Sequence, residues 1–182
     1  ARPVRTAITV FASLLLLLGL VAPGAARDEQ EETRRLAGED RVETAVRLAT
    51  TAYPEGTDVA VLARADAFPD ALAASGRAGA TGAAVLLTDR DRLSDATASA
   101  LVELGVSEVT IAGGPTAIAE AVADRLREDG YAVTRIEGAD RYATARRIAS
   151  SMDDAIGGIE GRGARTAVLA SGTRFPDALA SG

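Results

Sequence analysis

Short apolar runs and Ala-rich amphipathic stretches alternate along most of the chain. Runs rich in Val, Leu and Ile predict strands, and the stretches between them carry apolar residues at helical spacing. Gly, Pro or Asp marks the changes from one to the other. Several strand runs are continuously apolar, which is typical of strands covered on both faces. The pattern predicts an α/β fold with a parallel sheet and alternating helices.

The boundaries of the expected elements follow from these runs. Strands are expected at 35–37, 58–63, 83–88, 108–112, 132–136 and 166–170. Helices are expected at 40–53, 69–79, 94–104, 115–128 and 140–154, with another beginning at residue 176. Val102 and Leu104 are expected to be buried in the third helix, and Ile118, Val122 and Leu126 form one stripe at a spacing of four in the fourth.

Two stretches of the chain occur twice in the same order. The first copies are 35–45 and 60–73, and the second are 135–145 and 167–180. The second pair is displaced by seven residues more than the first, and the extra residues fall in a Gly-rich segment at 157–163. A surface loop there would absorb an insertion at little entropic cost. The conserved order predicts tandem repeat modules.

The first 26 residues resemble a secretory signal peptide. Arg2 and Arg5 precede an apolar run at 7–22, and small residues follow it. The alternative is a membrane anchor, but this run of 16 residues is shorter than the ~20 that span a bilayer comfortably. We expect export and no stable membrane association after cleavage.

These features predict four segments. They are a signal peptide at 1–26, a charged lead-in at 27–33, a first module at 34–130 and a truncated second module at 131–182. A parallel sheet that stops after one strand and half a helix would leave an apolar face uncovered. We therefore expect the natural protein to continue beyond Gly182.

The composition excludes several chemistries. The chain has 182 residues with no His and no Cys, which removes thiol nucleophiles, Ser-His-Asp triads, disulfides and the usual zinc sites. The formal net charge is -6, and no basic cluster stands out along the sequence, which argues against nucleic-acid binding. We expect no metal and no cofactor.

Each copy of the repeat opens its first helix with the same residue types. Asp40 and Asp140 can accept hydrogen bonds from free backbone N–H groups. Arg41 and Arg141 follow them, although a cation in the first helical turn opposes the helix dipole. Two interpretations stay open: each arginine faces an anionic ligand at the carboxyl edge of the sheet, or each pairs with a nearby carboxylate.

A second shared motif, Phe-Pro-Asp, lies at 68–70 and 175–177. Proline suits the first helical turn, and the aromatic ring is expected to pack the loop onto the helix rather than stack on a ligand. Asp70 and Asp177 could accept hydrogen bonds from sugar hydroxyls, or could pair with the arginines of the first motif.

Gly113 and Gly114 follow a predicted strand and precede a predicted helix, where exposed N–H groups could bind an anion. The surrounding residues match neither the dinucleotide-binding nor the P-loop pattern. A tight strand-to-helix turn is therefore the default interpretation.

Together, the motifs at 35–45, 68–73 and 111–114 resemble the type 2 cell wall-binding repeat of Gram-positive surface proteins. The resemblance covers 34–128 as one module and 135–182 as the start of a second. It implies Rossmann-like, non-catalytic modules that hold an exported, S-layer-type protein on the cell wall. The implied partner is an anionic wall polymer, either teichoic acid-like or a secondary polysaccharide. Further modules of the same chain are also implied, typically three about a pseudo-threefold axis.

The resemblance carries binding roles onto the shared positions. These are Asp40, Arg41, Phe68, Asp70, Asp140, Arg141, Phe175 and Asp177, with Thr173 added in the second copy. Arginines would meet phosphate or carboxylate groups, whereas Asp70, Asp177 and Thr173 would meet hydroxyls. The copies differ at 64–66, where the first has Arg-Ala-Asp and the second, at 171–173, has Ser-Gly-Thr.

Three alternatives to anchoring stay open. The chain could be an α/β enzyme acting on a sugar or phosphate substrate, with Asp, Glu or Tyr as its base. It could also belong to a wall hydrolase or protease whose catalytic domain lies beyond residue 182. Finally, its repeats could be a scaffold for self-assembly into a surface array.

Overall fold

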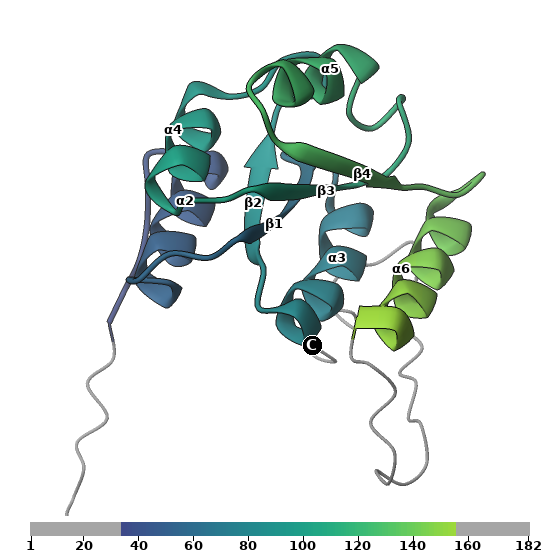
Figure 1. The fold of residues 1–182 in the computed structure, drawn as a ribbon, viewed down its shortest axis with the longest axis horizontal. Coiled ribbons are helices and arrows are strands. Elements are labelled where there is room, and N and C mark those ends of the chain that lie inside the picture. The colour runs from purple at the N-terminus through teal and green to yellow at the C-terminus, as the bar shows by residue number, and fades with distance from the viewer. Residues whose placement is uncertain (1–33, 156–182) are drawn as a thin grey trace, which may run out of the picture. The chain divides into compact units, whose positions relative to one another are not determined.

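The computed structural model describes residues 34–155, whose helices and strands belong to one compact unit beginning at Leu36. A parallel four-stranded sheet has the order β2-β1-β3-β4 (Figure 1). The strands are β1 (Val59–Arg64), β2 (Ala84–Thr88), β3 (Glu108–Ala112) and β4 (Ala132–Ile136). The helices are α2 (Arg41–Ala52), α3 (Phe68–Thr81), α4 (Asp95–Glu103), α5 (Glu120–Glu128) and α6 (Arg141–Ala155). The predicted α/β class with a parallel sheet is confirmed.

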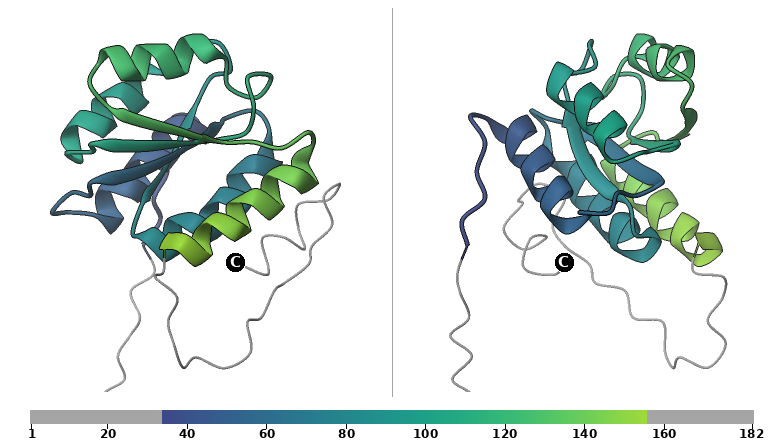
Figure 2. Two further views of the ribbon diagram at one scale, coloured as in Figure 1. Left: turned by 45° about the vertical axis from the view of Figure 1, so that its right-hand side comes forward. Right: turned by 60° about the vertical axis from the view of Figure 1, so that its left-hand side comes forward.

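Helices cover both faces of the sheet (Figure 2). Ala60 and Leu62 of β1 belong to the larger core, which α2, α4 and α5 cover, whereas Val61 belongs to the smaller core under α3 and α6. Successive strand residues point to opposite faces, so a strand covered on both sides must be apolar throughout. Fully buried side chains such as Leu62 and Leu86 each contribute about 1.5–3 kcal/mol.

The strand order changes direction between β1 and β3. From β1 the chain passes through α3 to β2, and from β3 it passes through α5 to β4 on the other side. Because α3 and α5 cover opposite faces, the connections that follow β1 and β3 separate at the carboxyl edge of the sheet. Such a switch point is where open α/β sheets usually bind ligands.

Two elements of the second sequence copy complete this unit. β4 pairs with β3, with Glu108 opposite Ala132. α6 packs along α3: Ile148 is buried in the smaller core, and Arg77 Nη1 donates to Ser151 Oγ at 2.8 Å. The packed unit therefore includes residues from both copies, and the module boundary at residue 130 stays a prediction.

The expected strand at 35–37 and the early start of the fourth helix are wrong. Residues 34–38 form no strand, whereas Arg135 and Ile136 of the second copy end β4, where β3 supplies the hydrogen-bonding partners. α5 begins at Glu120 rather than at residue 115. The N–H groups of Ala117 and Ile118 instead donate to the carbonyl of Gly114, at 2.8 and 3.1 Å, and form a turn.

Most expected burial is confirmed, with one exception. Ile118, Val122 and Leu126 are fully buried and Leu104 is buried, but 73% of Val102 is exposed. The buried residues of α4 are Thr97, Ala100 and Leu101, so Val102 lies off the stripe that faces the sheet. The strand expected at 166–170 and the helix expected from residue 176 lie outside the described residues.

Candidate functional site

The helix-start motif has the same hydrogen bonds in both copies. Asp40 Oδ1 accepts from the N–H of Glu43 at 2.9 Å, and Thr44 Oγ1 accepts from the N–H of Gly38 at 3.0 Å. In the second copy, Asp140 Oδ1 accepts from Ala143 at 2.8 Å and Thr144 Oγ1 accepts from Gly138 at 2.9 Å. These bonds satisfy N–H groups that a helix start leaves free. The repeated Gly, Asp and Thr are thereby explained by folding, and the repeated arginine is not.

Arg41 links the start of α2 to the loop that follows β1. Its Nη1 donates to the carbonyl of Ala65 at 3.0 Å, while the residue as a whole is exposed. Hydrogen bonds from Arg64 hold the pKa of Asp66 below its ordinary value, and the charge of Arg41 adds to this effect. Arg41 therefore lies at the carboxyl edge of the sheet, where it donates a hydrogen bond to the backbone carbonyl of Ala65.

Asp70 lies between the Gly113 turn and Arg141. Burial raises the pKa of Asp70, and the positive charge of Arg141 opposes that rise. Gly113 has φ of 102°, and a Cβ placed on it would lie 2.5 Å from Asp70 Oδ2. Only glycine allows both this backbone conformation and this close carboxylate. Asp70 of the first copy is thus close both to Arg141 of the second copy and to the Gly113 turn at the switch point.

The remaining predicted site residues are Phe68, the two glycines of the turn and three residues near the end of the chain. Phe68 is the first residue of α3 and is 39% exposed. The N–H of Gly113 donates to the carbonyl of Ile136 at 2.9 Å, and the carboxylate of Glu137 lies close to Gly114. The turn is therefore held by β4 and its following loop. Thr173, Phe175 and Asp177 lie outside the described residues.

Arg135 was not identified from the sequence as a site residue, although it recurs as Arg35. Its side chain is only 11% exposed. Nη1 donates to the carbonyls of Gly113 and Ile118, both at 3.0 Å, and Nη2 to Glu120 Oε2 at 3.0 Å. Arg135 holds the β3–α5 connection in place, while Arg35 is exposed.

Arg64, Asp66 and Arg90 are also new to the site. Arg64 and Asp66 form a two-pronged ion pair, with Nη2 and Oδ2 2.6 Å apart. The carbonyl of Thr116 accepts from Arg90 Nε at 3.1 Å and from Arg64 Nη1 at 3.5 Å. The difference between the copies at 64–66 was the signal that pointed to two of these residues.

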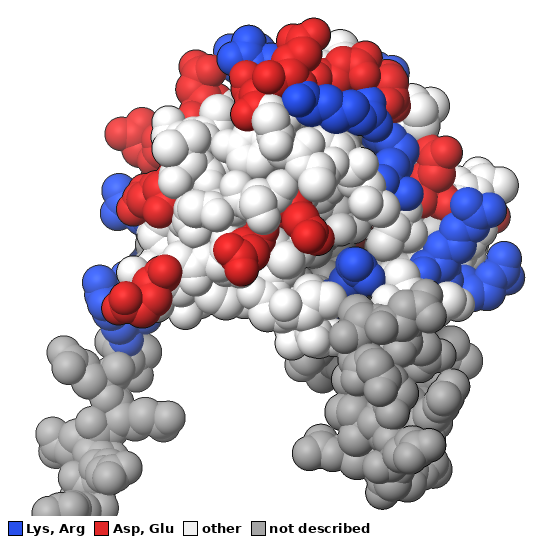
Figure 3. Space-filling view, in the orientation of Figure 1, with Lys and Arg blue, Asp and Glu red and all other residues white. Residues whose placement is uncertain are grey.

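Arginines also gather on α6. Arg141, Arg146 and Arg147 are all exposed, and Figure 3 shows blue side chains over this helix, while charges of both signs are mixed over α5.

Within residues 34–155, no group of three or more acidic side chains is arranged to hold a metal ion. Over the same residues, no helix has the length and apolar character needed to cross a bilayer.

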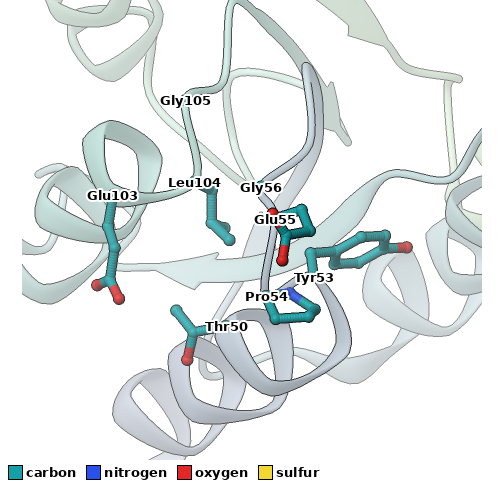
Figure 4. A pocket seen from close by; sticks show the side chains of 8 residues that line it. All are labelled: Thr50, Tyr53, Pro54, Glu55, Gly56, Glu103, Leu104 and Gly105. Carbon is teal, nitrogen blue, oxygen red and sulfur yellow. The ribbon is translucent and has the colours of Figure 1, made fainter.

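A pocket lies at the opposite edge of the sheet. It has a volume of about 340 Å³ and lies between the end of α2 and the turn from α4 to β3 (Figure 4). Glu55 and Glu103 are on its rim, and Gly56 and Gly105 precede β1 and β3. Its two carboxylates would repel an anion, so we place the candidate site at the carboxyl edge instead.

The family model for cell wall binding domain 2 matches the chain twice, at residues 35–123 and 135–182. The chain belongs to this family. The region described here is therefore a cell wall binding domain, and the predicted resemblance is confirmed. The two matches correspond to the two copies found within the sequence.

Two relatives from Bacillus subtilis (strain 168) are similar to this chain in sequence. The chain is 32% identical to the N-acetylmuramoyl-L-alanine amidase LytC over 148 residues, which are 81% of the chain and 29% of the amidase. It is 33% identical to the amidase enhancer over 153 residues, which are 84% of the chain and 20% of that protein. The chain thus spans less than a third of either relative.

Solved structures with the same fold come from Clostridium difficile. Cwp6 superimposes with a TM-score of 0.63 at 29% identity, over 65% of this chain and 19% of Cwp6. Cwp8 has a TM-score of 0.61 at 22% identity, over 79% of this chain and 24% of Cwp8. These likenesses support the Rossmann-like fold implied by the sequence.

Proposed function

We propose that this region holds an exported protein on the cell wall without a covalent bond, by binding an anionic wall polymer. The observation that carries the proposal is the repeated helix start. Its Gly, Asp and Thr build the start of each helix, whereas Arg41 and Arg141 extend from the two helix starts beyond what capping requires. Two guanidinium groups near one switch point suit a polymer with regularly spaced negative charges.

The expected contacts divide by chemistry. Arg41 and Arg141 would bind phosphate or carboxylate groups, and Asp70 would accept hydrogen bonds from hydroxyl groups near them. Asp177 and Thr173 would do the same in the second copy. Each contact is weak at an exposed surface, but modules on one chain that bind one polymer gain avidity by factors of ~100 or more.

The net charge of -6 opposes approach to an anionic polymer. At physiological salt, charges more than about 8 Å apart are largely screened, so the local arrangement of arginines outweighs the charge of the whole chain. Binding should weaken as salt rises.

We infer that the region itself is not catalytic. The amidase relative matches over only 29% of its length, which leaves room for a catalytic domain elsewhere in that protein. The same proposal includes export directed by a signal peptide at 1–26. It also includes an S-layer-type role on a Gram-positive cell and further modules in the same protein.

The test is retention of the purified chain on isolated cell walls, before and after their non-peptidoglycan polymers are stripped. The variant Arg41→Ala/Arg141→Ala should bind unstripped walls roughly tenfold more weakly, because two charge-assisted contacts are lost. The control Arg125→Ala/Arg127→Ala removes two exposed arginines of α5 with their surface ion pairs and changes the net charge equally. It should stay within about twofold, because the charge of the whole chain is largely screened. Undiminished retention of the first variant would contradict the proposal, as would equal binding to stripped walls.

A further inference from the structure

We infer that Arg41, Arg64 and Arg90 form a phosphate-binding site specific to the first copy, in which Asp66 occupies the position of the ligand's anionic group. This inference rests on the proposed function, because it names the chemical group that this copy would bind. It depends on Arg64 and Asp66, which distinguish the first copy, together with Arg41, which recurs as Arg141 in the second.

The three arginines come from three separate parts of the chain. Arg41 begins α2, Arg64 ends β1, and Arg90 follows β2. Arg64 and Arg90 donate to one carbonyl, that of Thr116, while Arg41 donates to the carbonyl of Ala65, next to Arg64. Three guanidinium groups therefore gather around the two connections that separate at the switch point.

Asp66 is the carboxylate beside two of these arginines, Arg64 and Arg41. It accepts two hydrogen bonds from Arg64 and lies close enough to Arg41 to feel its charge. One other carboxylate lies near these arginines: Asp91 Oδ1 is 3.8 Å from Arg90 Nε. This single contact is longer than the two-pronged contact that Asp66 makes with Arg64.

The Arg64–Asp66 pair can be displaced. The Asp66 side chain is 63% exposed, and ion pairs at such exposure contribute little to stability. A phosphate group can take the same two-pronged position on Arg64, because guanidinium binds phosphate and carboxylate in the same fork geometry. A tetrahedral phosphate also presents oxygens in more than one plane, which suits three donors from different directions.

The sequence of the second copy lacks the Arg64–Asp66 pair. Ser171, Gly172 and Thr173 stand where the first copy has Arg64, Ala65 and Asp66. The paired charges are replaced by hydroxyl groups, which suit a neutral sugar better than a phosphate. The two copies would therefore contact different groups of one polymer.

The experiment measures binding of the full 182-residue chain to linear inorganic polyphosphate, with polygalacturonate as a carboxylate polymer and dextran as a neutral one. Asp66→Asn should raise the affinity for polyphosphate roughly fivefold by removing the competing carboxylate, and Arg64→Ser should lower it by about as much. The control Asp124→Asn changes the net charge equally and removes one of the two carboxylates paired with Arg127, which keeps Glu120 as the other. Asp124 is 60% exposed and lies 2.7 Å from Arg127 Nη1, so it should change affinity less than about twofold.

Side-chain NMR of the wild-type chain gives a readout that does not depend on variants. The Nε–H signals of Arg41, Arg64 and Arg90 should shift together on addition of polyphosphate. Equal effects of Asp66→Asn and Asp124→Asn would overturn the inference, because net charge alone would then explain them. A response of these signals to polygalacturonate but not to polyphosphate would also overturn it. Loss of wall retention in Arg41→Ala/Arg141→Ala with no effect of Asp66→Asn would leave the proposed function standing and remove only this inference.

Discussion

The two copies of the repeated helix, α2 and α6, begin with the same hydrogen bonds but bury different faces. Val42 is 7% exposed in α2, whereas Tyr142 at the corresponding position of α6 is 58% exposed. Further along, Leu48 is 50% exposed and its counterpart Ile148 is 2% exposed. α2 packs with the larger core beside β2 and α4, and α6 packs on α3 across the sheet. One sequence motif can thus determine a helix start without determining which side of the helix is buried.

The arginine that precedes each helix differs even more between the copies. Arg135 is nearly buried and bonds to three groups of the β3–α5 region, whereas Arg35 is exposed. Identical residue types therefore stabilise the fold in one copy and not in the other. Three sets of substitutions test the comparison between the copies.

The largest difference is expected for Arg135→Met against Arg35→Met. The first leaves the carbonyls of Gly113 and Ile118 without this donor, while Glu120 keeps its contact with Arg127. It should lower the free energy of unfolding by about 2–3 kcal/mol. The second removes an exposed side chain and should change it by less than about 0.5 kcal/mol. Urea denaturation of both variants at pH 7 measures the difference, and equal losses would show that Arg35 is held as firmly as Arg135.

The next effect should be alike in both copies. A Cβ on Gly38 would lie 2.6 Å from the backbone nitrogen of Thr44, and one on Gly138 would lie 2.5 Å from Ala143 Cβ. Gly38→Ala and Gly138→Ala should each destabilise the protein by roughly 1–3 kcal/mol, because the helix start must move.

Gly79→Ala is the matched control, since nothing lies within 4 Å of its added Cβ inside α3. It should stabilise the protein by about 0.5–1 kcal/mol through helix propensity. If thermal unfolding showed Gly138→Ala to be as mild as Gly79→Ala, the close approach at the helix start would be disproved.

The smallest effect is expected at Asp70, which joins the copies. Burial raises its pKa in the folded state, so the folded protein binds more protons than the unfolded one between the unfolded and folded pKa values. The contribution of Asp70 to stability should therefore fall as pH rises through this window, which begins near pH 4.

Asp70→Asn removes this contribution. At pH 7 the variant should be as stable as the wild type or slightly more so, within about 0.5 kcal/mol. Denaturation at several pH values checks the sign: a variant that is less stable at pH 7 but equal at pH 3 would mean that attraction to Arg141 outweighs burial.

Most elements could be predicted from local patterns, and the errors share one cause. β3 and β4 have the predicted bounds, and the other strands from β1 onward shift by one residue at most. The segment at 35–37 has strand composition but no strand, because pairing depends on a neighbour that composition does not specify. The turn at 115–118 replaces a predicted helical turn. There the N–H of Ala119 donates to the backbone carbonyl of Arg90 at 2.8 Å, which is a contact between segments distant in sequence.

The features of the candidate site also divide into those with local partners, which the sequence predicts, and those with distant partners, which it does not. Asp40, Asp140 and the glycines before them were predictable as a helix start, since their partners lie within six residues. The meeting of Arg64 and Arg90 at Thr116 was not, because their partners lie 52 and 26 residues away.

The sequence alone determined the α/β class, the duplicated motifs and the family, because periodicity and repetition are properties of the residues in order. Only the tertiary structure decided that β4 joins the first sheet and α6 packs on α3, that Arg135 is nearly buried while Arg35 is exposed, and that Arg64 and Arg90 meet at the carbonyl of Thr116. Each of these depends on which distant segments pack together. Hydrophobic burial favours such packing without direction, so the partners are selected by the whole fold rather than by any local pattern.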